Sequence, residues 1–381
     1  MQLEEVKNLY SSSKESSLFH RYITNKHIEP LLNNLKEYLN IETIGYSVLK
    51  KPIYGLKIGN GTKRVLMWSQ MHGNESTTTK ALFDLLNTLL SKKENLKHIL
   101  DNCNLYIIPI LNPDGAEAYT RINANKIDLN RDAQHQTQPE SRVLNKVFKT
   151  FKPHYCYNLH GQRTIFSAGK TNKTATVSFL APAQDAACTI TPNRKIAMEI
   201  IGVMNKTLQK LIPNQVGVYD DAFNLNCVGD TFQSENIPTI LFEAGHFNND
   251  YAREKTREFI YISYLTSLNY ISKKAISGDY YEEYLKIPEN KKFFLDIIIR
   301  KAKINDEILD VGIQYVERLI AGKIKFIPKV EKIENLDTYF GHKEIEANGF
   351  QVFDEKNQLL QLGSENVFVM INNKKISLLS K

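Results

Sequence analysis

Short apolar runs alternate with segments of helical periodicity along the first 275 residues of the chain. The runs end at polar or turn residues, and few charged residues interrupt them. Near-continuous apolar runs of this length are typical of strands that are buried on both faces of a sheet. The clearest runs are VLMWSQ at 65–70, LYIIPIL at 105–111, CYNL at 156–159 and TILF at 239–242.

The segments between these runs predict helices. Ser76 is a suitable N-cap, and leucines recur at helical spacing from there to about residue 90. A proline in the first turn and an early glutamate favour a helix at 139–151. Further helices are predicted at 193–212 and 251–275. The alternation predicts an α/β fold: a mixed, largely parallel twisted sheet with helices on both faces.

The composition changes near residues 277–279. Beyond this point the chain is rich in isoleucine, valine and phenylalanine, which alternate with polar residues and are separated by turn residues. This pattern is typical of short strands. We therefore predict two domains, a larger α/β domain at 1–278 and a small β-rich accessory domain at 279–381.

Composition and charge narrow the partners and the compartment. The chain has 381 residues, of which 42% are hydrophobic, and its net charge of +7 is dispersed rather than gathered in blocks. We therefore expect a packed core and no nucleic-acid partner. The four cysteines form no C-x-x-C pair, and the first residues contain no apolar signal region. No apolar stretch approaches the roughly 20 residues of a membrane span, so we expect a cytoplasmic protein that has no membrane partner.

Polar residues with metal-binding or acid–base chemistry follow each of the four apolar runs. In open α/β sheets, ligands bind beyond the carboxyl ends of the strands. We therefore expect these side chains to meet at one edge of the sheet. They are His72 and Glu75 after the first run, Arg121, Asp128, Asn130 and Arg131 after the second, His160 after the third and Glu243 after the fourth.

The combination of these side chains suits a catalytic zinc ion, one per chain. The imidazoles of His72 and His160 and the carboxylate of Glu75 form a three-ligand site that leaves one position open for water. Glu243 is a separate carboxylate that can take the proton of this water and pass it to a leaving amine. Taken singly, His-x-x-Glu fits a polar loop and His160 fits the rim of the core. A carboxylate at the end of a buried strand is harder to explain without a function.

The motifs HGNE, NPDG, TRINANKIDLNRD, NLHGQ and ILFEAGH occur in the order and at the spacing of a known enzyme family. Over roughly residues 30–275, the chain resembles zinc metallocarboxypeptidases of the carboxypeptidase A-like family, and we interpret it as a bacterial-type cytoplasmic member. The resemblance implies a carboxypeptidase-like fold for the larger domain. The accessory domain lies outside the residues that carry the resemblance, and we expect it to pack against the catalytic domain and to narrow access to the site.

The resemblance also implies a role for each site residue. His72, Glu75 and His160 would ligate zinc, and Glu243 would be the general base and then the general acid. Arg121 would polarise the scissile carbonyl, and Asp128 would accept a hydrogen bond from the second nitrogen of His72. The substrate's C-terminal carboxylate would be bound by Asn130 and Arg131, and Tyr219 would cover the substrate.

The chain departs from the family pattern at several positions. Asn158 replaces the usual serine or aspartate two residues before the distal histidine, and Asp132 replaces the usual asparagine after the NR pair. Either Gly229 or Asp230 would line the specificity pocket. Asp230 would favour basic C-terminal residues, whereas Gly229 would leave a roomy apolar pocket. His246 is interpreted as a turn residue rather than as part of a second metal site.

The sequence thus predicts a zinc-dependent metallocarboxypeptidase that hydrolyses the C-terminal peptide bond of peptides with a free C-terminal carboxylate. Two alternatives remain open. The first is a related zinc amidohydrolase, either an N-acyl amino acid deacylase or an amidase of cell-wall peptides. The second is a peptide-binding module that has the same fold and no catalytic activity.

Overall fold

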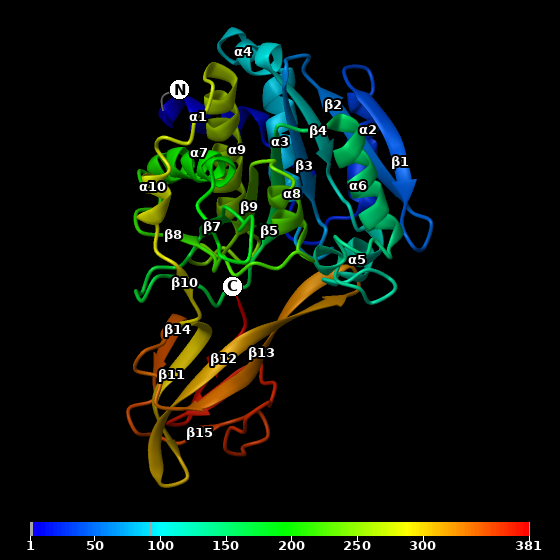
Figure 1. Ribbon diagram of the computed structural model, residues 1–381. Helices are drawn as coiled ribbons and strands as arrows, with labels where there is room; N and C mark the ends of the chain where they lie inside the picture. Colours follow the sequence, from blue (N-terminus) through cyan, green and yellow to red (C-terminus); the bar gives the residue numbers. More distant parts are fainter. Residues whose placement is uncertain (1–2, 92, 381) are drawn as a thin grey trace.

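The chain forms a larger α/β part and a smaller β part, which lies below the first in Figure 1. The computed structural model describes residues 3–91 and 93–380. Within this range no helix is long and apolar enough to cross a membrane.

An eight-stranded sheet organises the larger part. Its strand order is β1-β2-β4-β3-β5-β9-β7-β8. The central strands β4, β3, β5 and β9 are parallel to one another, whereas β2 pairs antiparallel with β4 and β7 pairs antiparallel with β9. The mixed, largely parallel sheet of the sequence analysis is therefore confirmed. The strands are β1 (Asn40–Tyr46), β2 (Pro52–Ile58), β3 (Lys63–Ser69), β4 (Cys103–Ile108), β5 (Tyr155–Gly161), β7 (Val177–Leu180), β8 (Val216–Val218) and β9 (Thr239–Ala244).

Helices cover both faces of the sheet because successive residues of its buried strands point to opposite sides. In β3, Val65 and Met67 belong to one apolar cluster, and Leu66 and Trp68 belong to the other. The first cluster includes residues of α1 (Leu3–Ser13), α2 (Asn25–Leu35), α3 (Thr77–Leu90), α4 (Glu94–Asn102), α7 (Pro192–Leu208) and α9 (Glu254–Lys273). The second includes residues of α6 (Pro139–Phe151) and α8 (Val228–Ser234).

The predicted helices form, with differences at their ends. Helix α3 begins after Ser76, but the Ser76 hydroxyl donates to the carbonyl of Arg21 (2.6 Å) and makes no capping bond. Helix α6 has the predicted bounds. Helix α9 begins at Glu254 rather than Tyr251, because Arg253 adopts a left-handed conformation with φ of 60°. The carboxylate of Asp250 then accepts the amide of Glu254 (2.8 Å).

The C-terminal part is rich in β structure, as predicted. A four-stranded sheet of order β13-β12-β11-β14 packs against a three-stranded sheet of order β15-β16-β17, with a shared apolar core. The boundary at residues 278 and 279 stays a prediction. The strands are β11 (Phe294–Ile304), β12 (Glu307–Ile320), β13 (Lys323–Glu334), β14 (Phe340–Glu346), β15 (Val352–Phe353), β16 (Phe368–Ile371) and β17 (Lys374–Ser377).

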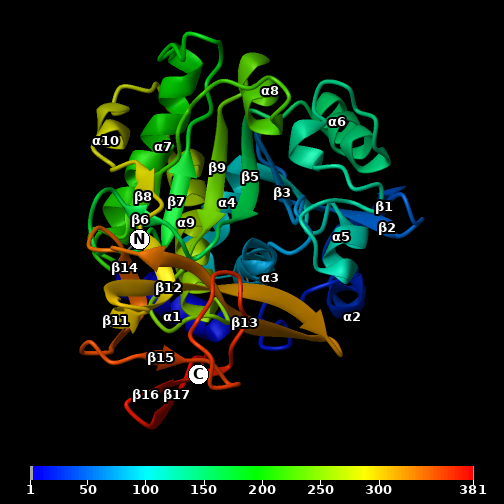
Figure 2. The same ribbon diagram turned by 90° about the horizontal axis from the view of Figure 1, so that it is seen from below.

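The hairpin of β12 and β13 joins the two parts (Figures 1 and 2). It reaches the short helix α5 (Pro113–Ala118) of the larger part. Glu317 of β12 forms an ion pair with Arg21 and accepts a hydrogen bond from the Tyr119 hydroxyl (2.6 Å). Ile324 and Phe326 of β13 pack in one apolar cluster with Tyr119. These contacts hold the β12–β13 hairpin against the larger part, at Arg21 and at Tyr119 directly after α5.

Candidate metal centre

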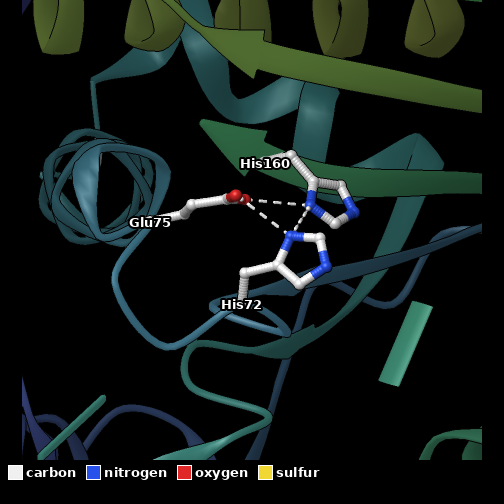
Figure 3. Close-up of side chains that lie close together, drawn as sticks. All are labelled: His72, Glu75 and His160. Carbon is white, nitrogen blue, oxygen red and sulfur yellow. Dashed lines mark hydrogen bonds and ion pairs between the residues drawn. The ribbon is translucent and has the colours of Figure 1, made fainter. Parts of the chain in front are cut away.

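Three side chains from two distant parts of the chain meet at the carboxyl ends of the central strands β3 and β5 (Figure 3). His72 and Glu75 lie in the loop between β3 and α3, and His160 lies in β5. The Nδ1 atoms of the two histidines are 3.0 Å apart, and each lies 3.0 Å from one oxygen of Glu75. Both imidazoles are 2% exposed. The predicted ligands therefore converge on one point.

The arrangement fits a zinc ion. Zinc binds imidazole nitrogen at about 2.0–2.1 Å in tetrahedral geometry, which separates neighbouring ligand atoms by about 3.3 Å. Two ring nitrogens and a carboxylate held at 3.0 Å from one another come close to that spacing. Among the described residues, this is the one group of three or more histidine, cysteine and acidic side chains that could hold a metal ion.

The HGNE loop has this shape because it packs directly on the NPDG turn. A Cβ atom at Gly73 would lie 1.9 Å from the carbonyl carbon of Gly115, so the close approach requires glycine. Asn112 fixes the turn from both sides. Its side chain accepts the amide of Gly115 (2.8 Å) and donates to the carbonyl of Met71 (3.2 Å), directly before His72.

Asp128 orients the first histidine. Its Oδ1 lies 2.9 Å from Nε2 of His72, and its Oδ2 accepts a hydrogen bond from Nε of Arg121 (3.0 Å). With the proton of His72 on Nε2, the lone pair of Nδ1 points at the centre. Burial lowers the pKa of His72, but the Glu75 and Asp128 carboxylates outweigh it and raise the pKa above its ordinary value. Burial alone would raise the pKa of Glu75. The two histidines outweigh this effect and hold the pKa of Glu75 below its usual range.

Glu243 stands beside this group without belonging to it. It lies opposite His160 in the register of β5 and β9. Its Oε2 atom is buried and has no hydrogen-bond partner in the described chain. Burial and the negative charge of Glu75 raise the pKa of Glu243 well above its ordinary value. A free carboxylate with a raised pKa has the properties of a general base and acid.

A cavity of about 430 Å³ opens beside the metal centre. Arg121, Asn130, Arg131 and Tyr219 all line it, together with Glu243. The structure thus brings every predicted site residue to the cavity, except Asp128, which contacts it through His72 and Arg121. His246 lies elsewhere, buried between the rings of Tyr251 and His342 at centroid distances of 4.7 and 4.4 Å.

The segment after Asp128 presents the guanidinium of Arg131 to the cavity, where its Nη1 donates to the carbonyl of Asn130 (2.9 Å). The amide of Asn130 donates to Asp128 (2.9 Å), and the Asn130 side chain accepts from the amide of Val228 (3.1 Å). Arg131 is exposed, and within residues 3–91 and 93–380 it has no carboxylate partner. Asp132, the unusual neighbour, accepts hydrogen bonds from the amides of Thr137 and Gln138 (both 2.9 Å). Its charge therefore holds the loop before α6 instead of neutralising Arg131.

The side chains of Asp230 and Asn158 place two oxygen acceptors in the wall of the cavity. Gly229 and Asp230 both line it, so the two alternatives of the sequence analysis are combined in one pocket. A Cβ atom at Gly229 would lie 3.0 Å from Pro182, whereas the Asp230 carboxyl is buried, and burial raises its pKa to about 6. Asn158, which departs from the family pattern, has a further feature. It lines the same cavity, and its Oδ1 atom is buried without a partner among the described residues.

Comparison with known proteins agrees with the fold and identifies the family. The family model "Zinc carboxypeptidase" matches residues 24–226, more than half of the chain, and the chain belongs to this family. A putative carboxypeptidase A from Shewanella denitrificans has a similar fold, with a TM-score of 0.56 at 19% identity over 66% of this chain and 69% of that one.

Curated relatives match over shorter stretches. A probable carboxypeptidase 2 of Trichophyton verrucosum is 28% identical over 29% of this chain and 21% of its own length. A gamma-D-glutamyl-L-diamino acid endopeptidase 1 of Lysinibacillus sphaericus is 31% identical over 22% of this chain and 25% of its own length. The chain therefore aligns with only about a fifth to a quarter of the length of these two relatives.

Proposed function

We propose that the protein is a zinc-dependent metallocarboxypeptidase that removes the C-terminal residue of peptides. The observation that carries the proposal is the convergence of His72, Glu75 and His160 within 3.0 Å, with the unbonded Glu243 beside them. When bound by these three residues, zinc supplies a Lewis acid that polarises a carbonyl oxygen and lowers the pKa of water to about 7.

Glu243 and Arg121 would perform the proton transfer and the charge stabilisation. Glu243 takes a proton from the attacking water and gives it to the amine of the leaving residue, so the same carboxyl acts first as base and then as acid. Arg121 is held by Asp128 at 3.0 Å and lies 3.6 Å from Glu75. Its guanidinium can therefore stabilise the oxyanion that develops on the scissile carbonyl.

The cavity explains why a free C-terminus would be selected. Arg131 and Asn130 line it beside the metal centre, and the Arg131 guanidinium can bind a carboxylate through paired hydrogen bonds. Tyr219 is partly buried in the same cavity and packs edge-to-face on Phe166 (5.3 Å). We assign Tyr219 the role of covering the bound residue.

The wall formed by Asp230 and Asn158 favours a basic C-terminal residue. Both side chains offer oxygen acceptors, and Asn158 Oδ1 has no partner in the described part of the chain. An ammonium or guanidinium group at this position would donate to both, whereas an apolar side chain would leave the Asn158 oxygen without a partner. We therefore propose lysine or arginine as the preferred leaving residue.

A related amidohydrolase remains the second candidate, because one aligned relative is named for a glutamyl–diamino acid bond. A mixed panel separates the two: α-linked peptides with every C-terminal residue, N-acyl amino acids, and γ-glutamyl diamino acid peptides. The proposal expects release of C-terminal residues from the α-linked peptides, with zinc bound at one per chain. His160→Ala should lose metal and turnover together. Exclusive cleavage of either other group would replace the proposed activity, and metal binding without any hydrolysis would favour a binding module.

We also propose a cytoplasmic location. All four cysteines are unpaired, and two of them, Cys188 and Cys227, are partly exposed. Free, accessible thiols persist in a reducing compartment. Fractionation of cells that produce the protein tests this location directly, and recovery in an oxidising compartment would contradict it.

A further inference from the structure

A second cavity, of about 360 Å³, lies next to the metal centre on the side of the accessory domain. It shares Glu75, Arg121 and the segment 161–163 with the first cavity, so the two meet at the predicted reaction centre. Its other wall is formed by Tyr315, Val316 and Glu317 of β12. The accessory domain therefore contributes directly to the surroundings of the metal centre.

Arginines dominate the lining of this second cavity. Arg253 is 1% exposed, and its guanidinium donates to the carbonyls of Ala244 (2.8 Å) and Gln162 (3.0 Å). It forms no ion pair with any described residue, and its Nε atom is buried without a partner. A buried cation without a counter-ion is costly unless a ligand completes it.

The remaining charges leave an excess of positive charge. Arg21 is neutralised by its ion pair with Glu317, and Arg121 by Asp128. Arg163 is exposed at the junction of the two cavities, and its guanidinium has no partner within the described residues. Arg253 and Arg163 form no ion pair with a described residue, and four arginines line the cavity against the two glutamates Glu75 and Glu317, so the cavity suits a ligand that carries a carboxylate.

The proposed function gives the direction in which a peptide would cross the two cavities. If Arg131 binds the C-terminal carboxylate in the first cavity, the scissile carbonyl lies at the metal centre. The residue on the amino side of the bond then leads into the second cavity, past Gly161 and Gln162. A side chain at that position lies between the arginines and the β12 wall.

We propose that this second cavity is a specificity subsite for a carboxylate side chain on the residue that precedes the scissile bond, with Arg253 and Arg163 as its cationic partners and Glu317 of the accessory domain as the opposing charge. Glu317 limits the positive field, so that peptides with a neutral residue at this position are also admitted. The orientation of the peptide in this inference rests on the proposed function. The positive charge of the cavity does not depend on it.

The test uses two blocked peptides that share a C-terminal residue and differ only in glutamate or glutamine before it. The zinc-loaded protein should cleave the glutamate peptide with a kcat/KM at least about tenfold higher, the ratio that one charge-assisted hydrogen bond provides. The ratio should fall as salt is added, since screening weakens charge pairing. The dissociation constants of the two peptides are also measured on the zinc-loaded Glu243→Gln protein. Their ratio reports the preference for glutamate without requiring turnover.

Three variants and a control separate subsite charge from stability. Arg163→Gln, at an exposed position, should bring the glutamate-to-glutamine ratio toward one, and Arg253→Gln should do so as well. Glu317→Gln should move the ratio in the opposite direction, which a general loss of structure would not do. Arg142→Gln is the matched control, because Arg142 is an exposed arginine on α6 that bonds only to backbone carbonyls of 136 and 137.

The outcomes separate this inference from the proposed function. Equal cleavage and equal binding of the two peptides, with a ratio that Arg163→Gln and Glu317→Gln do not change, would overturn the subsite. Tighter binding of the glutamate peptide without hydrolysis would support the subsite and overturn the proposed activity. If Arg253→Gln does not fold, the opposite shifts of Arg163→Gln and Glu317→Gln still decide the question.

Discussion

His160 and Glu243 are paired residues of the adjacent parallel strands β5 and β9. One is a predicted metal ligand and the other a carboxylate without a partner among the described residues. Because sheet register fixes their separation, the predicted ligand and the predicted base are positioned by backbone hydrogen bonds rather than by flexible loops.

This pairing gives a first prediction. Glu243→Gln removes the proton acceptor without changing the size of the side chain or the ligands. Zinc content should be unchanged and kcat should fall by about 10²–10⁴, the range for a general base. Glu307→Gln, an exposed position at the start of β12, is the control. Turnover of Glu243→Gln at the wild-type rate would remove Glu243 from the mechanism.

A second prediction concerns Asp128, which orients His72 at 2.9 Å. Replacing it with alanine frees the imidazole to rotate and removes the negative charge that favours its Nε2 proton. Zinc affinity should weaken by about 10–100-fold, as for other residues that support metal ligands. Competition with a chromophoric chelator measures this affinity. Unchanged affinity would show that Asp128 acts on Arg121 alone.

The pKa of Asp230 gives a third prediction, on pH dependence. Burial raises this pKa to about 6, so the carboxyl is neutral below pH 6 and charged above it. For peptides ending in lysine or arginine, KM should therefore rise as the pH falls through 6, whereas KM for peptides ending in leucine should not share that change. Asp230→Asn should abolish the difference between the two series. Parallel profiles for both peptides in the wild type would exclude Asp230 from substrate recognition.

A buried ion pair that lines neither of the two cavities gives a fourth prediction, on stability. Both Arg257 of α9 and Asp84 of α3 are fully buried, and Arg257 donates to Asp84 through two nitrogens at 2.6 Å. Arg257→Met leaves an uncompensated buried carboxylate and should lower the free energy of unfolding by about 3–5 kcal/mol. The double variant with Asp84→Leu should recover part of this loss. Denaturant titration measures both, and additive losses would contradict coupling between the two residues.

The sequence was sufficient to predict that the candidate ligands His72, Glu75 and His160 converge, because the relevant signals are local. His72, His160 and Glu243 each follow an apolar run, and parallel strands bring their carboxyl ends to one edge of a sheet. The same reasoning predicted the bounds of α6 and the start of α3, since proline and serine mark helix starts.

Features that depend on contacts distant in the sequence were not predictable. The ion pair of Arg21 and Glu317 spans 296 positions, and no local pattern marks either residue as a partner. The ring of His246 lies 4.4 Å from that of His342 in the C-terminal part, a contact that the local turn pattern does not predict. The joint contribution of Gly229 and Asp230 depends on how the irregular segment before α8 folds over the cavity, which periodicity does not describe.

Because β12 lies late in the chain, the wall that it forms beside the metal centre is synthesised after the candidate ligands. The ribosome releases the three candidate ligands and Glu243 before it has made Glu317, and nascent domains fold from the N-terminal end. A chain that ended before residue 307 would hold all the residues of the metal centre but would lack the barrier that β12 forms beside it. Proteolytic removal of the C-terminal part would therefore open the second cavity on the side of β12, without removing any candidate metal ligand.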